Sequence, residues 1–83
     1  MAKKEVGIIG LGNFGYYVGK SLIDMGHTVL GIDLDQEKVR QSQDVLSKVF
    51  QANATDKVAL EQLGIAEMDD VVICVGKAME ASI

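Results

Sequence analysis

The sequence predicts an α/β fold in which four short strands alternate with helices and form a doubly wound parallel sheet. Short apolar runs recur along the 83 residues, amphipathic segments separate these runs, and a glycine-rich turn follows the first of them. Strands that alternate with helices favour parallel pairing with right-handed crossovers. The expected order of elements is therefore β-α-β-α-β-α-β.

The first strand and helix are predicted over residues 5–10 and 13–25. The strand is apolar on both of its faces, which is typical of parallel sheets covered by helices on both sides. Gly26 is placed to end the helix in the left-handed conformation. Apolar residues three or four positions apart give the helix its expected inward face: Phe14, Val18, Leu22 and Met25.

The middle of the chain predicts two strands with a short helix between them. Residues 28–33 are rich in β-forming side chains, and residues 47–51 form a weaker run of the same kind. Asp35 can cap a helix that ends at about Gln43, with Val39 facing inward.

The last third predicts another short helix and the clearest strand. Thr55 or Asp56 can cap the helix, and Gly64 follows its end. The strand covers residues 70–75, and residues 78–83 resemble the opening turns of a further helix. The expected apolar positions of the short helix are Val58, Leu60 and Leu63.

Composition excludes several classes of protein. Eight basic residues against twelve acidic ones give a net charge of −4, which argues against a nucleic-acid-binding surface. A single cysteine, Cys74, excludes a disulfide framework or a multi-cysteine metal site. The sequence has no apolar run long enough to span a bilayer, and its first residues do not form a secretion signal. We therefore expect a cytoplasmic protein.

The glycine-rich turn has the spacing of a phosphate-binding loop. Gly10, Gly12 and Gly15 match the pattern G-x-G-x-x-G between a predicted strand and a predicted helix. The first glycine permits the tight turn, the second permits close approach of a pyrophosphate, and the third permits close packing of helix on strand. The N-terminus of the helix would offer N–H groups to the anion. This context predicts a Rossmann-like fold and a nucleotide ligand.

Asp33 lies at the end of the second predicted strand, 18 residues after Gly15. An acidic side chain at this place accepts hydrogen bonds from ribose hydroxyls and repels a 2′-phosphate. Neither Leu34 nor Asp35 offers a cation to such a phosphate, and Arg40 is more than a helical turn away. We therefore expect NAD(H) or another adenine nucleotide with free ribose hydroxyls, and we include Leu34 among the residues of the site. The alternative is that Asp33 is a loop residue or helps to cap the next helix.

The loop of Asn53, Ala54, Thr55 and Asp56 follows the third predicted strand. Ligands of open α/β sheets lie at the carboxyl ends of the strands, so this loop would border the same crevice. Its small side chains would leave room for an adenine ring. For Thr55 and Asp56, helix capping is the alternative role.

The sequence offers few candidates for catalysis. His27, the only histidine, falls in a turn at the opposite end of the predicted sheet, where an exposed side chain is expected. Cys74 lies in a predicted buried strand and is expected to be an inert thiol. The acidic residues Glu67, Asp69 and Asp70 are expected to form a solvated connection. We therefore expect a protein that is not an enzyme.

Taken together, these segments resemble the KTN/RCK (TrkA-N) domains of bacterial Trk- and Ktr-type potassium uptake systems. The resemblance rests on residues 6–15, 25–33, 52–56 and 63–76 and covers nearly the whole chain. It implies a regulatory subunit that binds NAD(H), ATP or ADP without chemistry and gates a membrane-embedded potassium transporter subunit. It also implies homo-oligomers, as dimers or rings of dimers, located in the cytoplasm at the inner face of the membrane.

The resemblance also assigns roles to individual residues. Asp33 would bind the ribose, Asn53, Ala54 and Thr55 would line the base, and Gly76 and Lys77 would border the phosphates. The family often has arginine where Asn13 stands, and an amide donates a hydrogen bond without neutralising a phosphate charge. The phosphate-binding positions would be Gly10, Gly12, Asn13, Phe14 and Gly15.

The same resemblance bears on domain organisation and on an alternative function. Because the family's domain continues through further elements, residues 1–83 are expected to be the N-terminal part of a nucleotide-binding domain, with no second domain present. The last strand would then have an open neighbour position, which favours pairing with another chain. The glycine turn also resembles the opening of hydroxyacid dehydrogenases, so the NAD-binding half of such an enzyme is the alternative.

Overall fold

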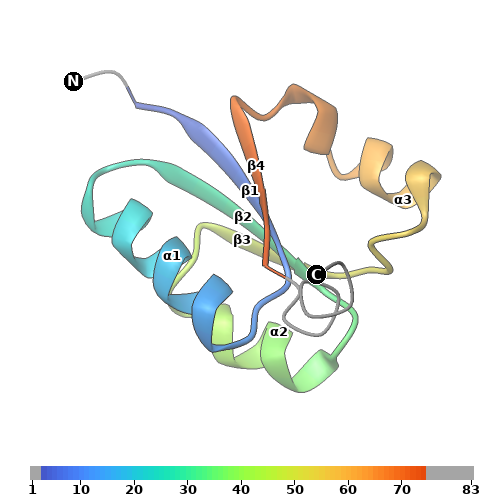
Figure 1. The fold of residues 1–83 in the computed structure, drawn as a ribbon, viewed down its shortest axis with the longest axis horizontal. Helices are drawn as coiled ribbons and strands as arrows, with labels where there is room; N and C mark the ends of the chain where they lie inside the picture. Colours follow the sequence, from blue (N-terminus) through green and yellow to red (C-terminus); the bar gives the residue numbers. More distant parts are fainter. Residues whose placement is uncertain (1–2, 75–83) are drawn as a thin grey trace, which may run out of the picture.

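A computed structural model describes residues 3–74 and contains a parallel sheet of four strands in the order β3-β2-β1-β4 (Figure 1). All three strand pairs are parallel, with Glu5 opposite Thr28, Val6 opposite Asp70 and Leu30 opposite Lys48. The predicted α/β, Rossmann-like fold is confirmed. Its elements are β1 (Glu5–Ile9), α1 (Asn13–Asp24), β2 (Thr28–Asp33), α2 (Gln36–Ser42), β3 (Lys48–Gln51), α3 (Lys57–Gln62), the 3-10 helix η1 (Ile65–Glu67) and β4 (Asp70–Ile73).

Helices cover the two faces of the sheet unequally. Figure 1 shows α1 and α2 together on one face, and α3 with η1 on the other. Side chains beneath α1 and α2 form the hydrophobic core, whereas α3 contains no buried residue. The buried members of this core are Ile8, Leu11, Val29, Leu46 and Cys74.

Aspartates cap the two short helices as the sequence predicts. The Asp35 carboxylate accepts a hydrogen bond of 2.9 Å from the Glu37 N–H at the start of α2. At the start of α3, Asp56 rather than Thr55 is the cap, and its carboxylate accepts from the Ala59 N–H at 3.2 Å. These caps fix where each helix begins after its strand.

The predicted inward face of α1 is partly wrong. Phe14 and Met25 are 64% and 58% exposed, while Gly15 and Gly19 are the buried residues of the helix. Val18 and Leu22 do pack against the core, as predicted. The glycines permit the close approach of the helix, since a Cβ at Gly19 would lie 2.6 Å from the Leu46 side chain. An apolar stripe chosen by spacing alone therefore points partly to solvent.

Two other expectations at the second face of the sheet also need correction. Val58, one of the expected apolar positions of α3, is 63% exposed. The strand predicted over residues 70–75 is β4, Asp70–Ile73, and it forms an edge of the described sheet with Val71 and Ile73 exposed. The predicted continuation through Val75 and the predicted helix at residues 78–83 lie outside the described residues.

The helices found between residues 3 and 74 are all too short or too polar to cross a membrane.

Candidate functional site

The glycine-rich turn joins the carboxyl end of β1 to the start of α1. Gly10 has a φ of +100°, in the left-handed region that favours glycine. Its backbone N–H donates a hydrogen bond of 2.8 Å to the Ile32 carbonyl oxygen of β2. The turn is thereby attached to the neighbouring strand, and Gly12 begins α1 as its N-cap without a side-chain hydrogen bond.

Gly15 permits the close approach of α1 to this turn. A Cβ built at Gly15 would overlap the Gly10 carbonyl oxygen and would lie 3.3 Å from the Cys74 Cβ. Because the obstacle is backbone, it cannot move aside as a flexible side chain can. A glycine is therefore required here by packing alone, whatever the ligand.

The Asp33 carboxylate connects the glycine-rich turn to the loop that follows β2. Its Oδ2 accepts a hydrogen bond of 2.7 Å from the Leu11 N–H, and its Oδ1 accepts one of 2.8 Å from the Asp35 N–H. Each oxygen of an ionised carboxylate has two lone-pair sites, so one site on each oxygen remains for a ribose hydroxyl. Asp33 thus combines a structural contact with the capacity for a ligand contact.

A cavity of about 210 Å³ lies at the carboxyl ends of β1, β2 and β3. Asp33 is the only charged residue among the described residues that line it. The structure therefore gathers five of the predicted site residues, from three separate loops, around one small and mostly apolar space. Its lining consists of Ile9, Gly10, Ile32, Asp33, Leu34, Ala52, Asn53 and Ala54.

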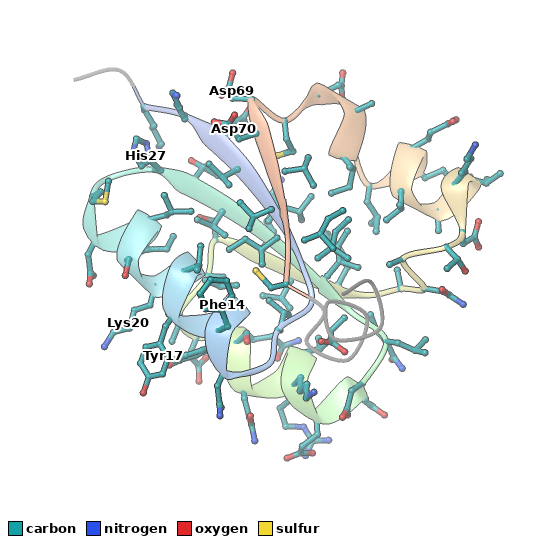
Figure 2. The ribbon with its side chains drawn as sticks, in the orientation of Figure 1. Phe14, Tyr17, Lys20, His27, Asp69 and Asp70 are labelled. Atoms are coloured by element: carbon teal, nitrogen blue, oxygen red, sulfur yellow. The ribbon has the colours of Figure 1, made fainter. Side chains whose placement is uncertain are left out.

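Other predicted site residues lie away from this cavity. The Thr55 hydroxyl and backbone N–H both donate to the Asn53 Oδ1, at 2.7 and 2.9 Å, so Thr55 stabilises its own loop. Phe14 extends from α1 and does not line this cavity (Figure 2). Gly76 and Lys77 lie outside the described residues.

A second cavity, of about 490 Å³, lies between the starts of α1 and α2. Leu11, Gly12 and Asn13 of the turn border it, with Tyr16 and Tyr17 of α1 and Lys38 and Gln41 of α2. Lys38 is the residue that sequence reasoning missed. A signal existed, since Lys38 follows Asp33 by five residues in the first turn of α2, where a cation is electrostatically unfavourable.

Comparison with known families places the chain within one of them. Residues 6–83 match the model of the TrkA-N domain. The chain belongs to the TrkA-N family. This finding confirms the resemblance inferred from the sequence, and TrkA-N domains are nucleotide-binding domains of the Rossmann type.

Several curated relatives of this TrkA-N chain are potassium uptake proteins. It is 36% identical over 81 residues to Ktr system potassium uptake protein C of Bacillus subtilis, covering 98% of the chain and 37% of the relative. It is 38% identical over 79 residues to Ktr system potassium uptake protein A of the same organism, covering 95% and 36%. The chain therefore spans little more than a third of the length of these relatives.

A solved structure shares the same fold. The crystal structure of N5-carboxyaminoimidazole synthetase from Staphylococcus aureus complexed with ADP superposes with a TM-score of 0.72 at 30% identity. The match covers 87% of the TrkA-N chain and 19% of the synthetase chain.

Neither His27 nor Cys74 of this TrkA-N chain lines one of the two cavities. The His27 Nδ1 accepts a hydrogen bond of 3.1 Å from the Lys4 N–H, at the end of the sheet opposite the two cavities. The side chain is half-buried rather than fully exposed as expected. Cys74 is only 6% exposed, and burial raises the pKa of its thiol, which disfavours the reactive thiolate.

Proposed function

We propose that this chain is the nucleotide-binding module of a regulatory subunit in a potassium uptake system. Its ligand would be an adenine nucleotide with free ribose hydroxyls, namely NAD(H), ATP or ADP. The observation that carries the proposal is the Asp33 carboxylate, which borders the 210 Å³ cavity while holding the glycine-rich turn through the Leu11 N–H. The match to the TrkA-N domain supports the same ligand class.

The residues suggest one orientation of the nucleotide. Asp33 would accept hydrogen bonds from the ribose, and the adenine would lie against the apolar cavity wall that includes Leu34 and Ala54. The phosphates would lie over Gly12 and Asn13, where the backbone N–H groups of α1 begin. The remaining expected contacts are Gly10, Phe14, Gly15, Asn53, Thr55, Gly76 and Lys77.

The protein would transmit nucleotide binding rather than perform chemistry on the nucleotide. Its partner would be a membrane-embedded potassium transporter subunit, which would hold it in the cytoplasm at the inner face of the membrane. Its own copies would associate as dimers or rings of dimers, and residues 1–83 would form the N-terminal part of the nucleotide-binding domain. The Ktr relatives support this role. A strictly monomeric mass by light scattering at high concentration would contradict the association.

The ligand proposal is tested by calorimetric titration of NADH, ATP and ADP into the wild-type chain and two variants. Asp33→Ala removes the proposed ribose contact, and Asp69→Ala removes a carboxylate that accepts a backbone N–H at the opposite end of the sheet. Loss of a hydrogen bond to a charged group costs about 1.5–3 kcal/mol, or roughly tenfold to a hundredfold in affinity. We expect this loss for Asp33→Ala alone. Equal affinities in all three proteins would exclude Asp33 from the site.

The non-catalytic part of the proposal is tested by spectrophotometry. NADH is incubated with the protein and a panel of 2-oxoacids, and absorbance is followed for hydride transfer. We expect no turnover above the protein-free rate. Turnover that Asp33→Ala abolishes would favour the dehydrogenase alternative.

A further inference from the structure

Among the described residues that line the cavity between α1 and α2, one side chain, that of Lys38, is cationic. Lys38 extends from the first turn of α2 toward the glycine-rich turn. A Cβ built on Gly12 would lie 3.9 Å from the Lys38 Nζ, which is the only described atom from outside the adjoining chain within 4 Å of that point. The ammonium group therefore stands beside the backbone over which the phosphates are proposed to lie.

Helix stability does not explain a lysine at this position. The N-terminus of a helix carries a partial positive charge, so a cation in the first turn is unfavourable. Glu37 supplies the favourable charge in that turn and pairs with Arg40 at 3.6 Å. Among residues 3–74, no carboxylate approaches the Lys38 ammonium within salt-bridge distance. Within the described part of the chain, neither helix polarity nor an ion pair thus accounts for the positive charge of Lys38.

Positive charge is scarce among the described residues of the site. Of the residues between 3 and 74 that line the two cavities at the carboxyl end, Lys38 is the only cation and Asp33 the only anion. Asn13, at the start of α1, donates hydrogen bonds but cannot neutralise a phosphate. Among the described residues that line these cavities, only Lys38 can offset the charge of a second or third phosphate group.

We propose that Lys38 is a specificity-determining residue that selects nucleotides with two or more phosphate groups over monophosphates. Its ammonium binds a phosphate beyond the first one, above Gly12, while Asp33 binds the ribose. The phosphate bound by Lys38 is not a 2′-phosphate, because the Asp33 carboxylate at the ribose would repel a second negative charge there. This inference rests on the nucleotide site proposed above and adds a preference for the length of the phosphate chain.

The test is a calorimetric titration of ATP, ADP and AMP, with NADH and NADPH for comparison, into the wild-type chain and three variants. Lys38→Gln removes the charge and keeps a hydrogen-bond donor, and Lys38→Arg keeps the charge. Lys48→Gln makes the same change of net charge at the amino end of β3, away from the glycine-rich turn. Lys38 and Lys48 are both exposed, so none of these changes disturbs the core.

We expect Lys38→Gln to weaken ATP and ADP about tenfold and to change AMP less than twofold, as the loss of one charge-assisted contact predicts. Lys38→Arg should retain most of the ATP affinity, and Lys48→Gln should bind like wild type. The ATP affinity of wild type should fall with added salt more steeply than that of Lys38→Gln.

Several results would overturn the inference while leaving the nucleotide site intact. Unchanged ATP affinity in Lys38→Gln would do so, and so would an equal loss for all three nucleotides. Loss of NADPH binding without loss of ATP binding would assign Lys38 to a 2′-phosphate instead. If the wild-type chain bound none of these nucleotides or NADH, both this inference and the proposed function would be wrong.

Discussion

The two ends of the sheet have the same kinds of groups and use them differently. At the amino end, the Asp69 carboxylate accepts from the Glu5 N–H at 2.7 Å, and the His27 ring accepts from the Lys4 N–H at 3.1 Å. The Lys4 ammonium lies 3.6 Å from the Asp70 carboxylate. Figure 2 shows His27, Asp69 and Asp70 gathered at this end. These groups satisfy one another.

At the carboxyl end, the polar groups border open space. Asp33 also accepts a backbone N–H at 2.7 Å, yet it lines a cavity of about 210 Å³, and Lys38 lines one of about 490 Å³. A smaller hollow of about 70 Å³ lies beside Glu5, Thr28 and Lys48 at the other end. A carboxylate or an ammonium group therefore indicates a ligand site only where it borders a cavity.

The parallel topology of the sheet explains why polar groups border cavities at its carboxyl end and are paired at its amino end. Each helix that follows a parallel strand begins near the carboxyl end of the sheet, so helix N-termini and their N–H groups meet there. The turns that precede the strands collect at the amino end, where backbone groups bond to neighbouring segments, as the Thr28 N–H does to the Lys4 carbonyl oxygen at 2.9 Å. Any anion-binding function of this fold is therefore expected at only one end.

The largest predicted effect compares one glycine from each end. Gly15→Ala forces a Cβ against the Gly10 carbonyl oxygen and should lower the free energy of unfolding by about 3 kcal/mol. Gly26→Ala meets no atom within 4 Å, but its φ is +92°, so it should cost about 1–2 kcal/mol through backbone strain. Urea denaturation measures both values. Equal losses would mean that the glycine-rich turn is no more tightly packed than the turn at the amino end.

The sequence predicted the order of elements and the capping aspartates because these depend on local chemistry. Strand periodicity, Asp35 before α2 and Gly26 after α1 are all features of a few consecutive residues. It failed on the inward face of α1 because two faces of that helix are apolar by spacing. Close contacts such as that of Gly19 with Leu46 select between these faces, and Leu46 lies far along the chain.

The candidate site was predictable to a similar extent. The glycine spacing and the place of Asp33 indicated the end of the sheet and a ligand class, since strand ends can be located from sequence. The position of Lys38 in the first turn of α2 was a signal in the sequence, but its approach to Gly12 was not, because that contact depends on the packing of α2 beside α1. The bond from the Leu11 N–H to Asp33 was equally hidden, since it joins residues 22 positions apart.

The second prediction compares the stability of the two aspartate variants without ligand. Asp33 is half-buried and accepts two backbone N–H groups, whereas Asp69 is exposed and accepts one. Asp33→Ala should therefore lower the free energy of unfolding by about 2 kcal/mol, and Asp69→Ala by about 1 kcal/mol or less. Thermal unfolding followed by circular dichroism provides the measurement. If Asp33→Ala left the free energy of unfolding unchanged, the Asp33 carboxylate would contribute nothing to the stability of the fold.

The smallest predicted effect concerns the ion pair at the amino end. The Lys4 and Asp70 side chains are 58% and 59% exposed and their charged atoms are 3.6 Å apart, so water and salt screen most of their attraction. Asp70→Asn should change the free energy of unfolding by less than about 0.5 kcal/mol, in low and in high salt. Urea denaturation at two ionic strengths tests this. A salt-dependent loss above about 1 kcal/mol would mean that these charges stabilise the fold substantially. Charged side chains would then matter at both ends of the sheet, for stability at the amino end and for the proposed nucleotide binding at the carboxyl end. Only the larger cavities would still distinguish the carboxyl end.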